Sequence, residues 1–246
     1  MTTFSELAYA HIRGKLERGL FGQTGELSEP GIARELGFSR TPVREAIGRL
    51  ACEGLLEQRP KQGTYVRRPT RRNLEEIYQI RLLLEPFVAA EAAQRMDDEA
   101  VTELANLLED MHRLARRCRT VSKEEDRDNF LQEHSSLDLA FHLVLLRSAG
   151  NSRIVKVISD TQILTQAFAF PKDSVNGALT SMAIGYREHR RILNAVRDRD
   201  CERSREMMAA HVSAASDRTL IYFDWLERHS SMPSPNRNSA DKIACD

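Results

Sequence analysis

Hydrophobic residues between positions 32 and 66 repeat at two different spacings. A helical spacing ends at Gly37 and resumes after a short turn, and it is carried by Ile32, Ala33 and Leu36, then by Val43, Ala46, Ile47 and Leu50. Gly37 suits the left-handed backbone that ends a helix, Ser39 is placed to cap the second helix, and Gly54 ends it. Strands are then expected over residues 55–58 and 64–67, joined by a turn at 60–63. This pattern predicts a helix-turn-helix followed by a β-hairpin wing.

The helical spacing continues on both sides of this motif. A first amphipathic helix is expected over residues 5–20, and six more over residues 73–95, 98–119, 123–148, 151–170, 176–199 and 201–228. The short connections between the six favour an antiparallel bundle. The pattern therefore predicts a mainly α protein, with a winged helix-turn-helix domain at residues 1–68, a linker at 69–73, an all-helical domain at 74–228 and a disordered tail at 229–246.

Composition is that of a soluble globular protein large enough for two domains, with 246 residues, 41% of them hydrophobic and 29% charged. No apolar run has the length of a membrane span, and the N-terminal residues lack the apolar stretch of a signal peptide. The four cysteines, at positions 52, 118, 201 and 245, follow no disulfide or metal-binding spacing. This usage favours reduced thiols and a cytoplasmic protein.

Charge is distributed unevenly although the formal net charge is zero. Between Gly31 and Arg72, ten basic residues stand against four acidic ones, which leaves about +6 there and about −6 elsewhere. A basic segment joined to an acidic remainder indicates a nucleic-acid-binding module. The residues expected to contact DNA are Arg34, Ser39, Arg40, Thr41, Arg44, Arg49, Lys61, Gly63 and Thr64. Arginine binds guanine edges or phosphates and hydroxyl groups bind phosphates, whereas the alternative is a solvated helix face.

The residues that carry the helix-turn-helix also carry a specific resemblance. Leu36–Ile47, Leu50, Glu53–Leu55 and Gly63–Val66 resemble the DNA-binding domain of the GntR family of bacterial transcription regulators. One segment departs from that pattern, since Pro30 and Gly31 stand where some members carry a basic residue. The resemblance implies a homodimer that binds a pseudo-palindromic double-stranded operator, because winged-helix proteins commonly read two half-sites.

Four side chains of the helical part are spaced to meet. Asp138 and His142 lie one turn apart on one helix face. His189 and His211 lie about ten residues before and after the turn that joins the last two expected helices, so they have the same height in an antiparallel pair. One carboxylate and three imidazoles suit zinc foremost, or nickel, manganese or iron. His134, one turn before Asp138, is a further candidate ligand, and the alternative is a set of core polar residues.

A second resemblance covers this helical part. Residues 80–85, 138–142, 149–151 and 188–193, together with His211, are similar to the effector domain of the FadR subgroup of GntR regulators. In that subgroup an Asp and three His commonly hold a divalent metal inside the bundle, and the metal binds the carboxylate of a small organic acid. The resemblance therefore implies that Asp138, His142, His189 and His211 are the metal ligands.

Two further residues are candidates for the effector site. Arg81 would neutralise the carboxylate of the acid, or else pair with Glu85 one turn away. Asn151 would contact the effector, or else cap the helix that follows it. The stretch 163–170 is less polar than its counterpart in many members, which predicts a pocket for a more apolar acid.

The sequence as a whole predicts a bacterial transcription regulator, of the repressor type, whose helical domain binds a metal and a small carboxylic acid. The sequence predicts that the protein is not an enzyme. Two alternatives remain at this stage: a regulator that senses the metal itself, and a metal-dependent hydrolase or oxygenase with a nucleic-acid-binding head. The second lacks an evident general base beyond the metal ligands.

Overall fold

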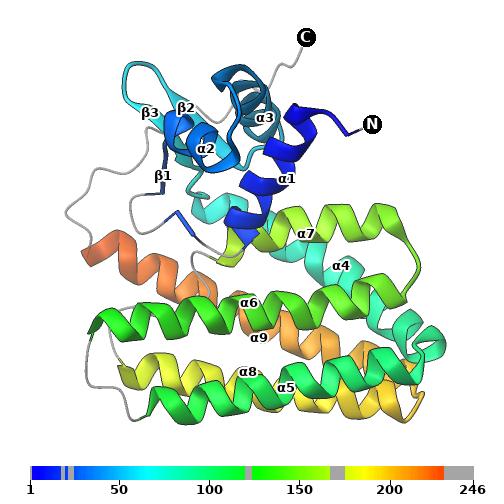
Figure 1. The fold of residues 1–246 in the computed structure, drawn as a ribbon. Helices are drawn as coiled ribbons and strands as arrows, with labels where there is room; N and C mark the ends of the chain where they lie inside the picture. Colours follow the sequence, from blue (N-terminus) through cyan, green and yellow to red (C-terminus); the bar gives the residue numbers. More distant parts are fainter. Residues whose placement is uncertain (1, 18–19, 22–24, 120–123, 167–174, 230–246) are drawn as a thin grey trace. The chain divides into compact units, whose positions relative to one another are not determined.

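The structure, a computed structural model, describes residues 2–17, 20–21, 25–119, 124–166 and 175–229. Its contacts separate two compact units, one containing the residues up to Arg68 and the other spanning Pro69–Trp225. Helices dominate both, and one small sheet lies in the first (Figure 1). The predicted mainly α architecture is confirmed. None of the described helices combines the length and apolar character needed to cross a bilayer.

The first unit contains three helices and a three-stranded sheet. The helices are α1 (Phe4–Glu17), α2 (Glu29–Leu36) and α3 (Arg40–Cys52), and the strands are β1 (Glu26–Leu27), β2 (Leu56–Arg59) and β3 (Gly63–Val66). The sheet is antiparallel in the order β1–β3–β2. Its helical core is formed by buried apolar residues of α1 and α3: Ala8, Ile12, Leu16, Val43, Ala46, Ile47 and Leu50. The apolar stripe read from the sequence thus faces inward.

The segment between the first expected helix and Ile32, for which no element was predicted, contains a strand and the first turn of α2. Glu26 and Leu27 form β1 against β3, so the wing belongs to a three-stranded sheet. α2 begins at Glu29 rather than at Ile32, because the side chain of Ser28 accepts a hydrogen bond from the backbone N–H of Gly31 at 3.1 Å. Pro30 falls in the first turn, where its missing N–H leaves no helical carbonyl unsatisfied.

The second unit contains six helices among its described residues. They are α4 (Arg71–Arg95), α5 (Asp98–Cys118), α6 (Glu124–Ser148), α7 (Ser152–Gln166), α8 (Val175–Arg197) and α9 (Cys201–His229). Residues 71–73, expected in the linker, form the first turn of α4, because Thr70 and Asn73 make a reciprocal capping box there. His229 belongs to α9, and the rest of the predicted tail, like residues 167–170 of the fourth predicted bundle helix, lies outside the described residues.

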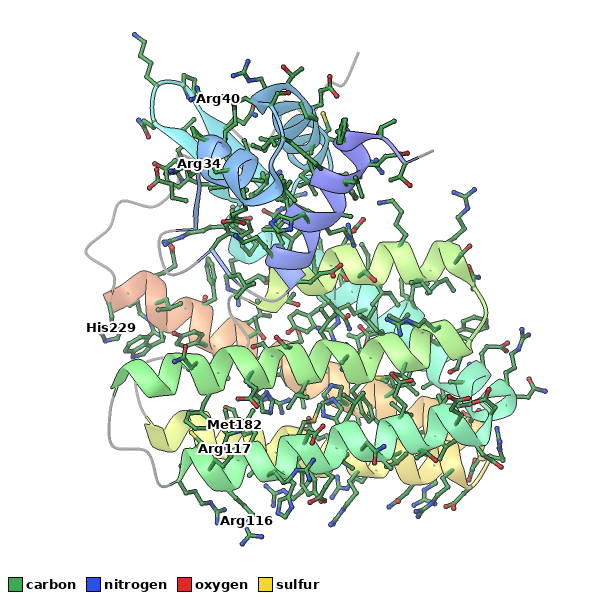
Figure 2. The ribbon with its side chains drawn as sticks, viewed as in Figure 1. Arg34, Arg40, Arg116, Arg117, Met182 and His229 are labelled. Atoms are coloured by element: carbon green, nitrogen blue, oxygen red, sulfur yellow. The ribbon has the colours of Figure 1, made fainter. Side chains whose placement is uncertain are left out.

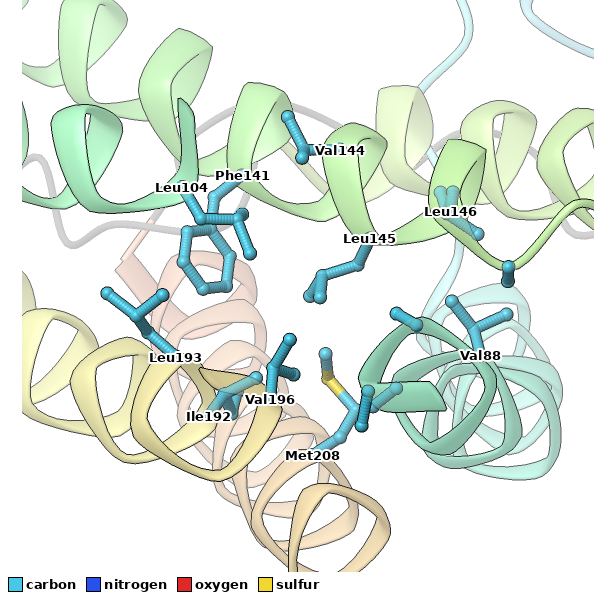
Figure 3. Close-up of a cluster of buried hydrophobic side chains, with 14 of the residues drawn as sticks. Val88, Leu104, Phe141, Val144, Leu145, Leu146, Ile192, Leu193, Val196 and Met208 are labelled. Atoms are coloured by element: carbon cyan, nitrogen blue, oxygen red, sulfur yellow. The ribbon is translucent and has the colours of Figure 1, made fainter. Parts of the chain in front are cut away.

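The core of the second unit lies between its long helices. Phe141 and Leu145 of α6 point toward side chains of α8 and α9, with Leu104 of α5 beside Phe141, as Figure 3 shows. Phe141 is fully buried, and its ring centroid lies 4.5 Å from that of His189. The apolar core therefore holds the helix faces that carry the histidines in a fixed rotation.

Candidate metal centre and nucleic-acid interface

Three of the four predicted metal ligands form a buried cluster between α6, α8 and α9. His142, His189 and His211 each offer one ring nitrogen, and these atoms lie within 4.8 Å of one another. His189 is fully buried, and the other two are nearly so. The equal heights expected from the sequence are therefore realised, because the rise of an α-helix is fixed at about 1.5 Å per residue.

Asp138 lies at the edge of this cluster. Its Oδ1 atom is 3.5 Å from Nε2 of His189, and Nε2 of His142 is 3.4 Å from the same His189 atom. The Asp138 side chain is about a third exposed. His134 is also buried, but it is not part of the three-histidine cluster.

The orientation of His142 is set by α4. Nδ1 of His142 lies 3.1 Å from Oε2 of Glu85, and Oε1 of Glu85 accepts a hydrogen bond from Nε of Arg81 at 2.5 Å. Arg81 and Glu85 are both buried. Burial opposes ionisation of Glu85, but the charge of Arg81 and the hydrogen bonds from His142 and Arg81 outweigh it and hold the pKa of Glu85 below its usual range. The carboxylate therefore stays ionised and fixes the proton of His142 on Nδ1.

His211 has a similar partner on α8. Its Nδ1 lies 2.8 Å from Oε2 of Glu188, and Arg218 donates to both carboxylate oxygens of Glu188 at 3.0 Å. The bidentate ion pair connects α8 and α9. Two hydrogen-bonded sets, Arg81–Glu85–His142 and Arg218–Glu188–His211, thus hold two of the three imidazoles by Nδ1.

These two hydrogen-bonded sets determine which ring nitrogen of His142 and of His211 carries the proton. With Nδ1 of His142 and of His211 hydrogen-bonded to carboxylates, both Nε2 atoms present lone pairs to the centre. Burial and the neighbouring histidines lower the pKa of His189, and burial also lowers that of His211, so both stay neutral. The Nε2 lone pairs of His142 and His211, with the ring nitrogen of His189 beside them, fit a divalent cation.

A cavity of about 60 Å³ adjoins the cluster. Its wall contains His134, Asp138 and His211. It also contains Arg81 and Arg218, the arginines that pair with Glu85 and Glu188. The remaining lining includes the polar residues Tyr78, Gln162, Thr165, Ser181 and Thr219 and the apolar residues Leu139 and Ala215. Oε1 of Gln162 is buried and has no hydrogen-bond partner among the described residues.

The expectation of a pocket for a more apolar acid rested on residues 163–170. α7 turns Gln162 and Thr165 toward the cavity, whereas residues 167–170 of that stretch lie outside the described part of the chain. Asn151, a candidate effector contact, does not line the cavity. Its exposed side chain accepts from the backbone N–H groups of Arg153 and Ile154, so it caps α7.

The expected DNA-contacting residues lie on the exposed side of the first unit. Arg40 and Thr41 begin α3 and are exposed, as is Arg34 of α2; Figure 2 labels Arg34 and Arg40. Ser39 has the backbone conformation of a helix cap but makes no side-chain cap bond, which leaves its hydroxyl available to a phosphate. Arg44 is 68% exposed and forms an ion pair with Glu29 at 2.9 Å.

The wing carries its expected residues at the tip between β2 and β3. Lys61 and Gly63 are exposed there, and Gly63 has a φ of 124°, a conformation that favours glycine. The hydroxyl of Tyr65 donates to the carbonyl of Gln62 at 3.0 Å and braces the turn. Thr64 is half-buried beside them.

Arg49 differs from the other arginines of α3. Its guanidinium lies 3.9 Å from the ring centroid of Tyr9 and pairs with Glu53 at 3.4 Å. Tyr9 in turn donates to Glu53 at 2.7 Å. Arg49 therefore packs α3 against α1 near the C-terminal end of α3, where its side chain stays 55% exposed, and it does not belong to the N-terminal surface of α3.

Two family models match this chain. Residues 4–66 match bacterial regulatory proteins of the gntR family, and residues 76–214 match the FCD domain. This chain belongs to the gntR family. The FCD domain is the FadR C-terminal type of domain, so the subgroup expected from the sequence is confirmed.

Relatives of this GntR-family chain are named as repressors. It is 32% identical to the gluconate operon transcriptional repressor of Bacillus licheniformis, over 66% of this chain and 60% of that protein. It is 29% identical to a probable D-xylose utilization operon transcriptional repressor of Paenarthrobacter nicotinovorans, over 87% of each. The chain spans only 60% to 63% of the length of the first relatives it matches.

Solved structures share the fold. E. coli McbR/YncC superposes with a TM-score of 0.73 at 20% identity, over 92% of this chain and 99% of that one. A GntR regulator from Rhodococcus superposes with a TM-score of 0.67 at 21% identity, over 88% and 97%. Relatives and neighbours are transcription regulators rather than enzymes, in agreement with the prediction for this chain.

Proposed function

We propose that this protein is a transcription regulator of the repressor type, which binds operator DNA as a homodimer and responds to a small organic acid held beside a divalent metal. The observation that carries the proposal is the presence in one chain of a helix-turn-helix with exposed arginines and a buried three-histidine cluster beside a polar cavity. The membership of the gntR family supports the DNA-binding part.

The N-terminal end of α3 is the proposed recognition surface. Arg40, Thr41 and Arg44 would enter the major groove, where arginine donates two hydrogen bonds to guanine. Ser39 and Arg34 would bind phosphates, and the wing residues Lys61, Gly63 and Thr64 would follow the backbone or the minor groove. Glu29 holds Arg44 by an ion pair before DNA binds and limits its rotamers.

The DNA-binding part is tested with Arg44→Ala. Its affinity for DNA sequences selected by the wild-type protein from a random pool is measured by fluorescence anisotropy. Loss of a bidentate base contact costs about 1–3 kcal/mol, so binding should weaken roughly tenfold or more. Arg205→Ala is the matched control, because Arg205 is an exposed, ion-paired arginine of the second unit. Equal affinity of Arg44→Ala and the control would refute the assigned helix.

The metal part rests on donor chemistry. His142, His189 and His211 would each give an Nε2 atom, and Asp138 a carboxylate oxygen. Imidazole with one carboxylate suits Zn²⁺, and also Ni²⁺, Mn²⁺ or Fe²⁺. A bound divalent ion would supply a Lewis-acid position for the carboxylate of the acid. Glu85 and Glu188 would keep the imidazoles oriented.

The effector part rests on the cavity. Arg81 and Arg218 provide positive charge, and hydroxyl and amide groups from Tyr78, Gln162 and Thr165 provide polar contacts. A volume of about 60 Å³ holds only a few atoms the size of water. This combination favours a short hydroxylated acid over a fatty acid.

The effector is tested by thermal melting with lactate, malate and octanoate, with and without a chelator. A ligand that binds the folded state raises the melting temperature. We expect malate or lactate to stabilise the metal-loaded protein and octanoate to have no effect. Stabilisation by octanoate alone would contradict the proposal that the effector is a short hydroxylated acid. If no acid changes the melting temperature, the proposal of an organic acid beside the metal fails.

One observation favours a second candidate, a regulator that senses the metal alone. Arg81 and Arg218 are already paired with Glu85 and Glu188, so the cavity has little unbalanced positive charge. In that case Zn²⁺ by itself would change DNA affinity with no acid present. The same anisotropy assay, with Zn²⁺ against chelator, distinguishes the two.

A further inference from the structure

A second cavity, of about 570 Å³, lies between α5 and α8 in the second unit. Besides two alanines, its lining contains three arginines and two rings: Arg116, Arg119, Arg187, His112 and Tyr186. Among the described residues, it shares no lining side chain with the cavity beside the histidine cluster. Small-molecule sites typically enclose about 300–1,000 Å³. This hollow, called the α5–α8 cavity below, is therefore large enough for an organic ligand of its own.

The three arginines of the α5–α8 cavity are not neutralised within the described part of the chain. Arg116 and Arg119 form no ion pair there, and no carboxylate lines the cavity. Nε of Arg187 donates to the carbonyl of Ala183, one turn earlier on α8, at 3.2 Å, which leaves its charge unbalanced. All three side chains are exposed, and Figure 2 labels Arg116 at the outer edge of α5.

Neighbouring arginines of α5 are balanced, in contrast to those of the cavity. Arg113 pairs with Asp110, and Arg117 pairs with Glu133 of α6 at 3.4 Å. A basic last turn also complements the dipole of α5, but Arg187 lies in the middle of α8, where that explanation does not apply. The α5–α8 cavity thus collects positive charge from two helices beyond what the fold itself requires.

The two rings of the cavity hold α5 and α8 together. His112 and Tyr186 stack with ring centroids 5.1 Å apart and planes inclined by 26°, and both are half-buried. The guanidinium of Arg190 lies 5.8 Å from the centroid of the Tyr186 ring. The stack fixes the height of one helix against the other, so arginines of both helices face one space. Within the described residues, neither the Tyr186 hydroxyl nor the His112 ring makes a hydrogen bond, so both can donate to a ligand.

We propose that the α5–α8 cavity binds a small molecule with two or more phosphate groups, such as inorganic pyrophosphate or a nucleoside diphosphate. Guanidinium has five N–H donors and no acceptor, and its fork matches two phosphate oxygens at once. Each phosphate group carries about −1.5 to −2 charges near neutral pH, so two groups offset three arginines. A single carboxylate would offset one arginine and fill little of the volume.

Duplex DNA carries the same phosphates but presents them on a convex surface. A hollow between two helices matches a compact anion better than it matches a duplex. The inference goes beyond the proposed function, because it adds a second ligand on the bundle and requires neither the metal nor the acid. The two sites share α8, since His189 of the cluster lies two residues after Arg187 and is buried on the inner side of that helix.

The test is isothermal titration calorimetry of the full chain with pyrophosphate and with ADP, at fixed ionic strength, with and without a chelator. Arg116→Gln and Arg187→Gln each remove one charge from the cavity. Arg197→Gln is the matched control, because Arg197 is an exposed arginine of α8 outside the cavity that donates to Asn194 at 3.1 Å. Loss of a charge-assisted donor should weaken binding of both probes roughly tenfold or more in each cavity variant. The control should bind as the wild type does, and thermal melting verifies that every variant folds.

Two outcomes support the site and separate the sources of its phosphates. Equal affinity for pyrophosphate and ADP identifies the phosphate groups alone as the ligand, whereas tighter binding of ADP identifies a nucleotide. The inference is overturned if the folded wild type binds neither probe. It is also overturned if Arg44→Ala or the chelator abolishes binding that both cavity variants retain, because the phosphates then occupy the DNA-binding surface or the metal.

Two further controls decide the class of ligand. If citrate binds as tightly as pyrophosphate, the cavity selects charge rather than phosphate, and the proposed class is wrong. If the cavity variants weaken DNA binding while the wild type binds neither pyrophosphate nor ADP, the arginines contact nucleic acid, and the small-molecule site is refuted.

Discussion

Replacing Glu188 by glutamine removes one of the two carboxylates that orient the histidine cluster. Oε2 of Glu188 accepts from Nδ1 of His211 at 2.8 Å, and both oxygens accept from Arg218. Glutamine has nearly the same shape but no charge. It accepts hydrogen bonds through one oxygen only, and its amide nitrogen, itself a donor, would face the N–H group of His211 or of Arg218.

The size of the effect follows from the position of Glu188 behind the ligand. Loss of a hydrogen-bond partner behind a metal-ligating histidine costs about 10–100-fold in metal affinity. This corresponds to about 1.4–2.8 kcal/mol of binding free energy. The fall has two sources: the imidazole becomes a weaker base without the carboxylate, and its ring loses a fixed orientation.

The assay is competition for Zn²⁺ with a chelating dye, followed by the absorption spectrum of the Co²⁺-loaded protein, which reports coordination geometry. Glu202→Gln is the matched control, because Glu202 is an exposed α9 carboxylate paired with Arg205. We expect the dissociation constant of Glu188→Gln to rise and that of the control to stay at the wild-type value. A folded Glu188→Gln protein with unchanged affinity and spectrum would show that His211 does not bind the metal through Nε2.

Two further predictions concern the metal-free protein. Burial lowers the pKa of His189 and of His211 from the unfolded value of 6.5, so below pH 6.5 the unfolded chain binds protons that the folded chain does not. The free energy of unfolding should therefore rise with pH up to about 6.5, by at most about 1.4 kcal/mol per pH unit for each histidine. Urea unfolding at several pH values measures this rise. A free energy of unfolding that does not change with pH in that range would contradict neutral buried histidines. Gly37→Ala should destabilise by about 1 kcal/mol, because Gly37 has a φ of 68° although a Cβ would meet no atom within 4 Å. Gly48→Ala, inside α3 with the same open space, should stabilise by about 0.5–1 kcal/mol, and equal effects of the two would refute the role of backbone conformation.

Sequence spacing could place the histidines because a helix has a fixed rise and a fixed angle per residue. The break between α8 and α9 determines the heights of His189 and His211, and the apolar stripes determine which side faces the core. The helix-turn-helix was accessible for the same reason, since both of its helices repeat every three to four residues. Gly37 marks the end of α2 by its left-handed backbone.

Features that depend on tertiary pairing could not be read from spacing. Glu188 directly precedes His189, yet it turns about 100° away along the helix and meets His211 of α9 instead. β1 has two residues, too few for a periodic pattern, and it exists because β3 offers it partners. The polar groups that α7 adds to the cavity depend on the rotation of that helix, which presents Gln162 and Thr165.

Arg81 and Arg218 give the coupling between metal and acid a sign that can be measured. Both arginines line the cavity, and both donate to the glutamates that orient His142 and His211. An acid that takes hydrogen bonds from these arginines draws them away from Glu85 and Glu188, and it should therefore weaken metal binding. An acid whose carboxylate binds the metal directly should strengthen it. By thermodynamic linkage, the factor by which malate changes the dissociation constant of Zn²⁺ equals the factor by which Zn²⁺ changes that of malate. If malate lowers the dissociation constant of Zn²⁺, the result supports a carboxylate bound directly to the metal. If malate raises it, the acid binds the arginines alone.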